Sequence, residues 1–457
     1  MAKHQINQFG TKIGLIAATV GSAVGLGTIW RFPAEVQSGG GAAFLLLYVV
    51  CVFLLAIPVM LSEFALGRST REDAVGAYRK LSPDSKWWMA GGLAVVSSYL
   101  IMCFYMVVGG WTLEYLLGAV SGDLFEPFYQ GQGAHEMFNG KMQEYVSGGW
   151  SPIVNTCMII IINIGVLVCG VQKGIERMSN IMMPLLFVSL CVIMGYVLCQ
   201  LGSFGGVEYF FKPDFSKITP GVMVGALGQA LFSLSLGMGI LITYSSYFPS
   251  DTRLTRTSVI VSVMTLVVAV MMGLIIFPAM SAFGMNDANH CVEGTTLVFV
   301  TLPEVFMCME GGRVWAIIFF SLLLLAALTS TVSIAEVSVA FVGRRFKLSR
   351  FKSTLLVLLP LLLFSSICAM SFGPLENFKI GGYTIFDGLD TLTNNIMLPV
   401  VALLGVIFVG WVAPRKLMRD QLTNNGAFKS VFESAVMFVI RYIAPVVILV
   451  ILISNIL

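Results

Sequence analysis

The feature that most constrains this chain is a series of long apolar stretches with little between them. About eleven stretches of roughly 20 residues or more follow one another along the 457 residues. They cover residues 11–37, 41–66, 88–120, 152–170, 179–200, 219–247, 256–283, 313–342, 353–371, 384–413 and 431–456. Hydrophobic residues make up 57% of the chain and charged residues 11%, more apolar surface than a soluble protein of this length can bury. We therefore expect an all-α polytopic membrane protein with about 11 transmembrane helices.

Charge in the connecting segments predicts the orientation in the membrane. Alternate connections are rich in lysine and arginine, among them Arg68, Arg71, Arg253, Arg344 and Lys429. The opposite set holds only Lys141, Lys212, Lys217, Arg313 and Lys379. Because positive residues concentrate on the cytoplasmic side, we expect a cytoplasmic N-terminus. With eleven spans, the C-terminus would be extracytoplasmic, in the plasma membrane that forms the inner membrane of a bacterium.

Composition argues against several other classes of protein. The net charge of +3 and the absence of a basic arm give no indication of nucleic-acid binding. The nine cysteines are scattered without a CxxC pair, so a disulfide or metal framework is not expected. The histidines, His4, His135 and His290, lie in the tail and the connections, and no HExxH or GxSxG motif occurs. An enzyme is therefore not expected.

Two of the apolar stretches are interrupted by glycines at mid-depth. Gly21, Gly25 and Gly27 interrupt the first stretch, and Gly237 and Gly239 interrupt the sixth. Each glycine weakens a helix by about 1 kcal/mol relative to alanine, and unwound backbone within a membrane is tolerated only where it lines a protein cavity. The alternative is that these glycines merely allow close packing between helices.

The placement of the two interruptions favours a transporter. The first opens a set of five stretches over residues 11–200, and the second opens another five over 219–413. A repeat with an odd number of spans is inserted the opposite way up the second time, and paired broken helices in inverted repeats mark central binding sites. We expect one transporter domain over residues 1–457, with 431–456 as the eleventh helix. Free N–H groups at half-helix ends suit a carboxylate, and freed carbonyls suit a cation.

Sequence motifs along nearly the whole chain resemble one family. The segments GSAVGLGTIWRFP, GGGAAFLLLYVV and IPVMLSEFALGR resemble the opening of the neurotransmitter:sodium symporter family. GQALFSLSLGMG and LAALTSTVSIAE are similar to its sixth and eighth helices, and DGLDTLT to the start of its tenth. The resemblance implies a 5+5 inverted-repeat, leucine-transporter-like fold. It also implies a sodium-coupled secondary active symporter that imports amino acids by alternating access. A sensor that binds without transporting, or a channel-like member of the same fold, is the alternative.

The same resemblance implies sodium sites. The second site would use backbone carbonyls and hydroxyls of Gly21, Val24, Ala326, Thr329 and Ser330. The first site would use Ala23, Thr28, Ser233 and Thr265. Taken alone, a Thr-Ser pair on a membrane helix is more typical of bonding to its own helix carbonyls. The family has asparagine at the positions of Thr28 and Thr265, and a threonine hydroxyl reaches less far. We expect one or two sodium ions, with the first site weak or empty.

The substrate site implied by the resemblance lies between the two broken helices. It would be lined by Ala23, Leu26, Gly27, Ile101, Tyr105, Phe232, Ser233, Ser235, Met238, Ser330 and Ile334. The amides of Leu26 and Gly27 and the hydroxyl of Tyr105 would hold the substrate carboxylate. Family members that carry amines place an aspartate where this chain has Gly25, so an amino acid is expected. Met238 between two glycines indicates an adaptable apolar pocket, which favours a hydrophobic or aromatic side chain.

Gating and coupling residues complete the expectations. Arg31 and Asp390 resemble the outer gate, with Phe232 as the lid over the substrate. The positions of the family's inner ion pair hold Ile6 and Arg344, which cannot pair, and Lys3 or His4 with Glu336 is a possible substitute. Ala269 stands where members differ by chloride dependence, so a chloride requirement stays open. The expected partners are an amino acid, as the small-molecule substrate, and the lipid bilayer, with the chain a monomer or weak homodimer.

Overall fold

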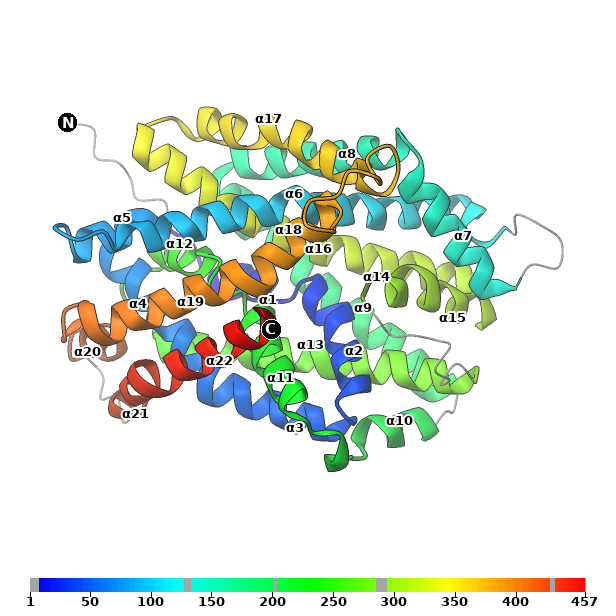
Figure 1. Cartoon of the computed structure of the whole chain (residues 1–457), viewed down its shortest axis with the longest axis horizontal. Helices are drawn as coiled ribbons and strands as arrows, with labels where there is room; N and C mark the ends of the chain where they lie inside the picture. Colours follow the sequence, from blue (N-terminus) through cyan, green and yellow to red (C-terminus); the bar gives the residue numbers. More distant parts are fainter. Residues whose placement is uncertain (1–7, 127–132, 201–203, 285–293, 428–431, 457) are drawn as a thin grey trace.

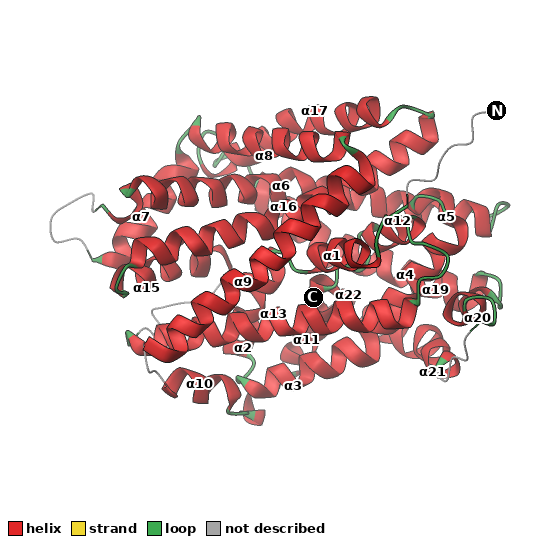
Figure 2. Ribbon diagram, turned by 180° about the vertical axis from the view of Figure 1, so that it is seen from behind, coloured by secondary structure: helices red, strands yellow, loops and turns green. Residues whose placement is uncertain are grey.

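The fold is a bundle of helices that run mostly side by side (Figure 1). The computed structural model describes residues 8–126, 133–200, 204–284, 294–427 and 432–456. Figure 2 shows that the described part consists of helices and their connections, without a strand. Two isolated β-bridges, Gly41 with Pro213 and Ile380 with Tyr383, occur in the connections.

Within the described residues, nine helices are long and apolar enough to cross a membrane. They are α3–η2–α4 (Ala42–Thr70), α6 (Trp88–Ser121), α8 (Ser151–Val168), η4–α9 (Val171–Cys199), α13 (Leu254–Ala282), α16 (Gly312–Phe346), α17–η7 (Arg350–Phe372), α18–η8–α19–η9 (Ile385–Val412) and α21–η10–α22 (Glu433–Ile456). These lie within the stretches expected from the sequence, apart from small shifts at their ends.

The two remaining expected spans are broken, as the glycines predict. The first consists of α1 (Lys12–Ala23), then η1 (Gly27–Arg31) and α2 (Phe32–Ser38), with a bend of 56° at the break. The sixth consists of α11 (Pro220–Ser233) and α12 (Ile240–Ser246), separated by an irregular segment. Neither α11 nor α12 is long enough to cross a membrane alone. Within the described residues, the nine unbroken helices and the bent first span make ten. The interrupted sixth stretch, α11 and α12, lies where the remaining expected span was placed.

The start of the fifth span differs from the expectation of residue 179. A π-helical turn, η4 (Val171–Glu176), leads directly into α9 (Arg177–Gln200), so the span begins eight residues earlier. Val171 and Ile175 are buried there. Burial of these side chains against the bundle favours helix over the loop that Lys173 and Arg177 suggest in the sequence.

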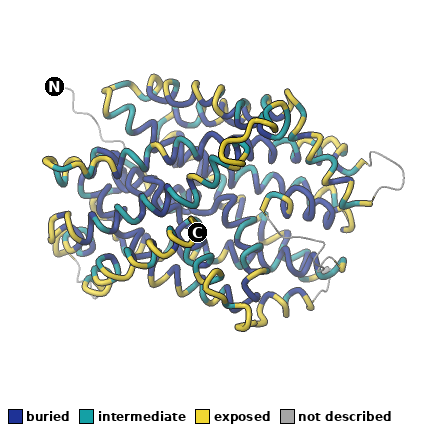
Figure 3. The backbone as a smooth tube through the Cα atoms, in the orientation of Figure 1, coloured by how far each residue is buried: buried dark blue, intermediate teal, exposed yellow. Residues whose placement is uncertain are grey.

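The buried centre of the bundle is formed by α16, α6 and the broken helices. Of the most apolar window of α16, 72% is buried, against 22% for the span that ends in α22 (Ala444–Ile456). Figure 3 shows the same contrast between a buried interior and exposed outer surfaces. α6 packs along α16, and α12 packs along α4 (Ile57–Thr70). This arrangement encloses both breaks.

Candidate functional site

The first helix is broken by a change of hydrogen-bond partners at Gly25. The N–H of Gly25 would continue the helix by donating to Gly21, but it donates instead to the carbonyl of Ala23, at 3.1 Å. The next amide, that of Leu26, donates to the Tyr105 hydroxyl on α6, at 3.0 Å. The break therefore releases the Gly21 carbonyl from its helical partner and directs the Leu26 amide at Tyr105.

The break in the sixth span depends on three residues with left-handed backbone. Ser235, Gly237 and Gly239 have φ of 54°, 77° and 73°, a conformation that glycine adopts without strain. A Cβ on Gly237 would lie 2.6 Å from the carbonyl oxygen of Leu398, so this glycine also allows close approach of backbone. The segment is held from outside, because the Gly237 N–H donates to Glu63 Oε1 on α4 at 2.8 Å.

The two breaks contact each other directly. The Ser235 hydroxyl donates to the carbonyl of Ser22 at 2.7 Å, and the Gln229 side-chain amide donates to the carbonyl of Gly27 at 3.1 Å. A Cβ on Gly27 would lie 2.1 Å from the ring of Phe232. The Phe232 ring therefore packs directly against the backbone of the first break. Phe232 is the residue that the sequence analysis proposed as the lid over the substrate.

A small chamber lies between the breaks, α6 and α16. The predicted substrate residues that line it are Ala23, Gly27, Ile101, Tyr105, Phe232, Ser233, Ser235, Met238, Ser330 and Ile334. Leu26 does not line it, but its amide meets Tyr105 there. Sequence reasoning missed Ser22, Phe104 and Asn394 as lining residues. Phe104 was detectable because it lies three residues after Ile101 and so shares a helix face with it, whereas nothing in the sequence distinguished Asn394.

The residues proposed for the second sodium site meet where α1 ends beside α16. A Cβ on Gly21 would lie 3.3 Å from Cβ of Thr329, so the two residues are in contact. The Thr329 hydroxyl bonds back to the carbonyls of Ala326 and Leu325, at 3.0 and 3.1 Å. It thus lies beside Ala326, another proposed ligand. Val24 ends α1 with non-helical backbone, φ −84° and ψ 83°.

The residues proposed for the first sodium site are only partly assembled. The Thr28 hydroxyl donates to the carbonyl of Ala23 at 3.3 Å, which brings two of the four together. The Ser233 hydroxyl is 2.7 Å from the Tyr48 hydroxyl, and the Thr265 hydroxyl bonds back to Val261 on its own helix at 3.0 Å. The side chains of Ser233 and Thr265 are thus engaged with other partners.

The proposed outer gate lies beside a second cavity of about 290 Å³, which we call the outer cavity. Arg31 and Glu35 line this outer cavity, and Phe232 and Asn394 line both it and the chamber. The Arg31 guanidinium lies over the Phe232 ring, 5.5 Å from its centroid, and pairs with Glu35 at 3.6 Å. Asp390 accepts from the Asn394 side-chain amide at 2.6 Å. Phe232 and Asn394 therefore separate the outer cavity from the chamber.

At the opposite end, Glu336 is paired within the helix bundle. Its carboxylate forms a two-pronged ion pair with Arg350, at 2.8 and 2.5 Å, and accepts from the Tyr247 hydroxyl at 2.7 Å. Glu336 has no exposed surface. Lys3 and His4, the substitutes suggested from the sequence, and Ile6 lie outside the described residues. Arg350 is thus the cation that the described part of the chain supplies to Glu336.

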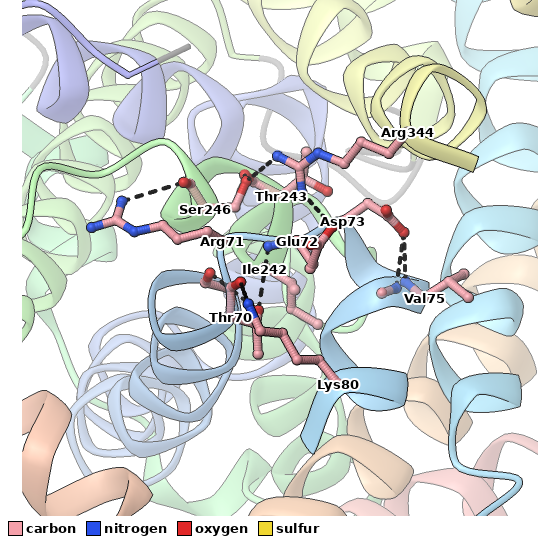
Figure 4. Close-up of polar contacts among 12 residues, drawn as sticks. Thr70, Arg71, Glu72, Asp73, Val75, Lys80, Ile242, Thr243, Ser246 and Arg344 are labelled. Atoms are coloured by element: carbon pink, nitrogen blue, oxygen red, sulfur yellow. Dashed lines mark hydrogen bonds and ion pairs between the residues drawn. The ribbon is translucent and has the colours of Figure 1, made fainter. Parts of the chain in front are cut away.

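Arg344, at the position of the family's acid, joins a polar cluster at the same end (Figure 4). Its guanidinium donates to the Ser246 hydroxyl at 3.0 Å and lies 3.8 Å from the carboxylate of Glu72. Nearby Asp73 begins α5 (Ala74–Leu81) by accepting from the amides of Val75 and Gly76. Burial raises the pKa of Asp73, while those amides and the charge of Arg344 oppose the rise. Arg344 on α16 therefore faces Glu72 and Asp73, the two acids that follow α4.

Glu63 is the most informative residue that sequence reasoning did not single out. It is 4% exposed and lies in the middle of an apolar span, in the segment IPVMLSEFALGR. An ionisable group inside a membrane span is expensive and marks function by default, so this signal was present in the sequence. Its partner, the Gly237 amide, could not be identified without the tertiary structure.

Comparison with known proteins agrees with this arrangement. A model of the sodium:neurotransmitter symporter family matches residues 6–135 and 137–457. An uncharacterized sodium-dependent transporter of Bacillus subtilis (strain 168) is 34% identical over 100% of this chain and 99% of its own length. An uncharacterized sodium-dependent transporter of Haemophilus influenzae is also 34% identical, over 99% of this chain and 98% of its own length.

Solved structures agree as well. The crystal structure of MhsT in complex with L-phenylalanine superposes with a TM-score of 0.87 at 37% identity, over 98% of this chain and 99% of that one. The all-α, leucine-transporter-like fold expected from the sequence is thereby confirmed. The chain therefore belongs to the sodium:neurotransmitter symporter family, whose members are sodium-coupled transporters in the membrane rather than enzymes.

Proposed function

We propose that this protein imports amino acids with hydrophobic or aromatic side chains, together with sodium, by alternating access. The observation that carries the proposal is the environment of Gly25. A Cβ there would lie 2.6 Å from the Ser330 hydroxyl and 3.0 Å from the Tyr105 hydroxyl. A side chain at this position would have to displace both groups. An amine-binding acid is therefore absent, and the Tyr105 hydroxyl, which accepts from the Leu26 amide, can donate its own O–H to a carboxylate instead.

The rest of the chamber supports an apolar substrate side chain. Ile101, Phe104, Met238 and Ile334 contribute apolar lining, with Phe232 on the side of the outer cavity. The related MhsT was crystallised with L-phenylalanine. Carbonyls around the breaks, those of Ala23, Phe232 and Ser235 among them, would receive the ammonium group. The carbonyls of Ala23 and Phe232 already accept from the Gly25 and Ser235 amides, and a carbonyl oxygen has a second lone pair for a further donor.

Sodium would occupy the second site and stabilise the broken first helix against α16. The Gly21 carbonyl has lost its helical partner, and Thr329 lies in contact with Gly21. Oxygen ligands without a carboxylate suit a monovalent cation that must also be released. The first site, with Ser233 and Thr265 engaged elsewhere, would contribute weakly or not at all.

Alternating access would follow from two inverted five-helix repeats, residues 11–200 and 219–413, with 431–456 as the eleventh helix. The N-terminus would be cytoplasmic, because the connections on that side carry most of the lysine and arginine. In a bacterium this membrane is the inner membrane. The protein would act as a monomer or weak homodimer, and Ala269 leaves its chloride requirement to experiment.

Uptake by purified protein in liposomes tests the proposal. With sodium outside and potassium inside, radiolabelled phenylalanine or leucine is expected to accumulate above its external concentration. Dissipating the sodium gradient is expected to abolish the accumulation. Binding of these amino acids without accumulation would instead identify a sensor, and flux down the substrate gradient that ignores sodium would identify a channel-like protein. Protein-free liposomes provide the control.

A further inference from the structure

A basic cleft between α1 and α13 has no role in the chamber or the gates. Its volume is about 580 Å³. It is lined by Lys12, Ile13, Leu15, Ile16, Asp251, Thr252, Arg253, Arg256, Thr257 and Ile260. Three cations and one carboxylate thus surround it, and the carboxylate, Asp251, pairs with Lys12 at 2.9 Å. Among the residues that line the cleft, cations therefore outnumber carboxylates.

Two of these positive charges lie at the N-terminal ends of helices, which themselves favour anions. Lys12 is the first residue of α1, and Arg256 is the third of α13. Helix N-termini carry partial positive charge, so cations there are unfavourable unless an anion joins them. Thr11 caps α1 by accepting from the Gly14 amide, whereas no side chain caps α13. The first amides of α13 consequently remain available to a ligand.

A buried hydroxyl points to the same ligand. Thr252 is 6% exposed, lines the cleft, and its hydroxyl has no hydrogen-bond partner among the described residues. A buried hydroxyl without a partner costs about 1–3 kcal/mol. Its backbone carbonyl is already engaged, because it accepts from the Arg68 guanidinium. An anion in the cleft would provide the missing acceptor for the hydroxyl.

The apolar part of the cleft distinguishes a lipid from a soluble anion. Ile13 is 76% exposed, and Ile260 continues on α13 into Val263 and Val267, which are 39% and 41% exposed. Arg256, Ile260, Val263 and Val267 follow helical spacing and share one face. Basic groups next to an exposed apolar stripe suit a headgroup phosphate with its acyl chain, and basic clefts at the cytoplasmic ends of membrane helices bind such headgroups.

We propose that this cleft binds the phosphate of an anionic phospholipid from the cytoplasmic leaflet, which bridges α1 to α13. Lys12, Arg256 and the Thr252 hydroxyl contact the phosphate, and the acyl chain lies along Ile260 and Val263. The leaflet assignment rests on the cytoplasmic N-terminus of the proposed function, whereas the binding site itself does not depend on transport. Because α1 ends at the break that lines the chamber, the lipid would stabilise the half-helix next to the substrate.

Lipid binding to the purified full chain tests this proposal without any transport measurement. Retention of phosphatidylglycerol is measured by native mass spectrometry, and melting temperature is measured in nanodiscs of phosphatidylcholine with and without phosphatidylglycerol. Lys12→Gln/Arg256→Gln is expected to weaken phosphatidylglycerol binding on the order of thirtyfold, since each basic group near an anionic headgroup contributes about fivefold. The rise in melting temperature that phosphatidylglycerol produces should shrink accordingly.

Matched variants separate the site from general charge effects. Arg345→Gln/Lys347→Gln removes the same two charge types from exposed positions at the end of α16 and should bind phosphatidylglycerol like the parent. Thr252→Val, which removes the hydroxyl at nearly constant volume, should melt no lower than the parent in phosphatidylcholine alone but bind phosphatidylglycerol several-fold more weakly. Equal losses in both double variants would overturn the proposal. So would stabilisation by inorganic phosphate that matches phosphatidylglycerol.

Discussion

At the scale of single residues, the chemistry of the chamber depends on what Gly25 lacks. Its missing side chain leaves room for the Ser330 and Tyr105 hydroxyls to approach the first break, and the Leu26 amide is directed at the same point. The chamber thereby presents neutral donors on this side. A carboxylate on the proposed amino-acid substrate would be stabilised there, whereas an aspartate at residue 25 would reverse the preference.

Decarboxylated analogues test this reading of Gly25. Tyramine is expected to compete for binding far more weakly than tyrosine, because it cannot accept from the Leu26 amide and Tyr105. Each lost hydrogen bond to a charged group is worth about 1.5–3 kcal/mol, or roughly one to two decades in affinity. Competition against a bound radiolabelled amino acid measures the ratio, and similar inhibition by the two compounds would contradict the assignment.

Two hydroxyls on α16 are expected to carry the sodium dependence. Thr329→Ala/Ser330→Ala removes two of the five proposed ligands of the second site, so sodium-driven uptake should fall to background while the protein still folds. Thr331→Ala is the control, because Thr331 is a buried threonine of the same helix that is not among the proposed ligands. Uptake and thermal unfolding are measured for all three proteins. Normal uptake by a folded double variant would exclude this sodium site.

Thr28 is expected to limit the number of sodium ions. Its short hydroxyl reaches Ala23, while Ser233 and Thr265 bond elsewhere, so a cation at the first site would lack ligands and be costly to desolvate. Substrate binding should depend on sodium with a Hill coefficient of about one. Thr28→Asn should raise sodium affinity and steepen the curve. A coefficient near two in the unmodified protein would show that the first site is filled.

At the scale of helices, each break is held by side chains from unbroken neighbours. Tyr105 on α6 accepts the amide after the first break, and Glu63 on α4 accepts the Gly237 amide. Ser98 on α6 donates to the carbonyl of Met238, at 2.5 Å. The unwound segments are thus satisfied by defined partners, which is the condition for irregular backbone at membrane depth.

Glu63 is therefore predicted to position the sixth-span break. Glu63→Ala leaves the buried Gly237 amide without an acceptor, at a cost of about 1–3 kcal/mol, and should lower both the melting temperature and the affinity for substrate. Glu63→Gln keeps a carbonyl oxygen and should lose much less of either. Thermal unfolding and binding of radiolabelled substrate measure the two effects. Alanine and glutamine variants that behave alike would argue against this role.

At the scale of the molecule, two groups of charged and gating residues lie on either side of the chamber. Arg31, Phe232 and Asn394 lie toward the outer cavity, and the Glu336–Arg350 pair lies at the other end. The second cluster is deeply buried, and an ion pair buried this well costs much to break by removing one partner. It joins α16 to the start of α17, and Tyr247 extends it to the segment after α12.

Breaking the Glu336–Arg350 pair is expected to destabilise the end of the bundle at which this pair lies. Glu336→Gln leaves the Arg350 guanidinium without its countercharge, at a cost of about 3–5 kcal/mol. Removing both charges with Glu336→Gln/Arg350→Met should recover most of that stability. A double-mutant cycle on thermal unfolding measures the coupling. Accessibility of a cysteine introduced at Ser333 reports opening, and additive effects of the two single changes would refute the coupling.

The sequence by itself determined the membrane class, the eleven spans and the positions of the breaks. These properties depend on local features: the length of each apolar stretch, and clusters of glycine that weaken a helix at mid-depth. The motifs around Gly21, Phe232 and Thr329 also indicated the family, and the predicted substrate residues lie around one chamber or, for Leu26, direct an amide to it.

The tertiary structure decided which groups meet across the bundle. Only the fold shows that Glu63 holds Gly237, that Arg350 rather than an N-terminal cation pairs with Glu336, and that the fifth span starts at Val171. The cleft at Lys12 and Arg256 is likewise invisible in the sequence, where its two sides are more than 200 residues apart. The physical reason is common to all of these: hydrophobicity and helix propensity act along the chain, whereas hydrogen bonds and ion pairs between helices depend on which faces pack together.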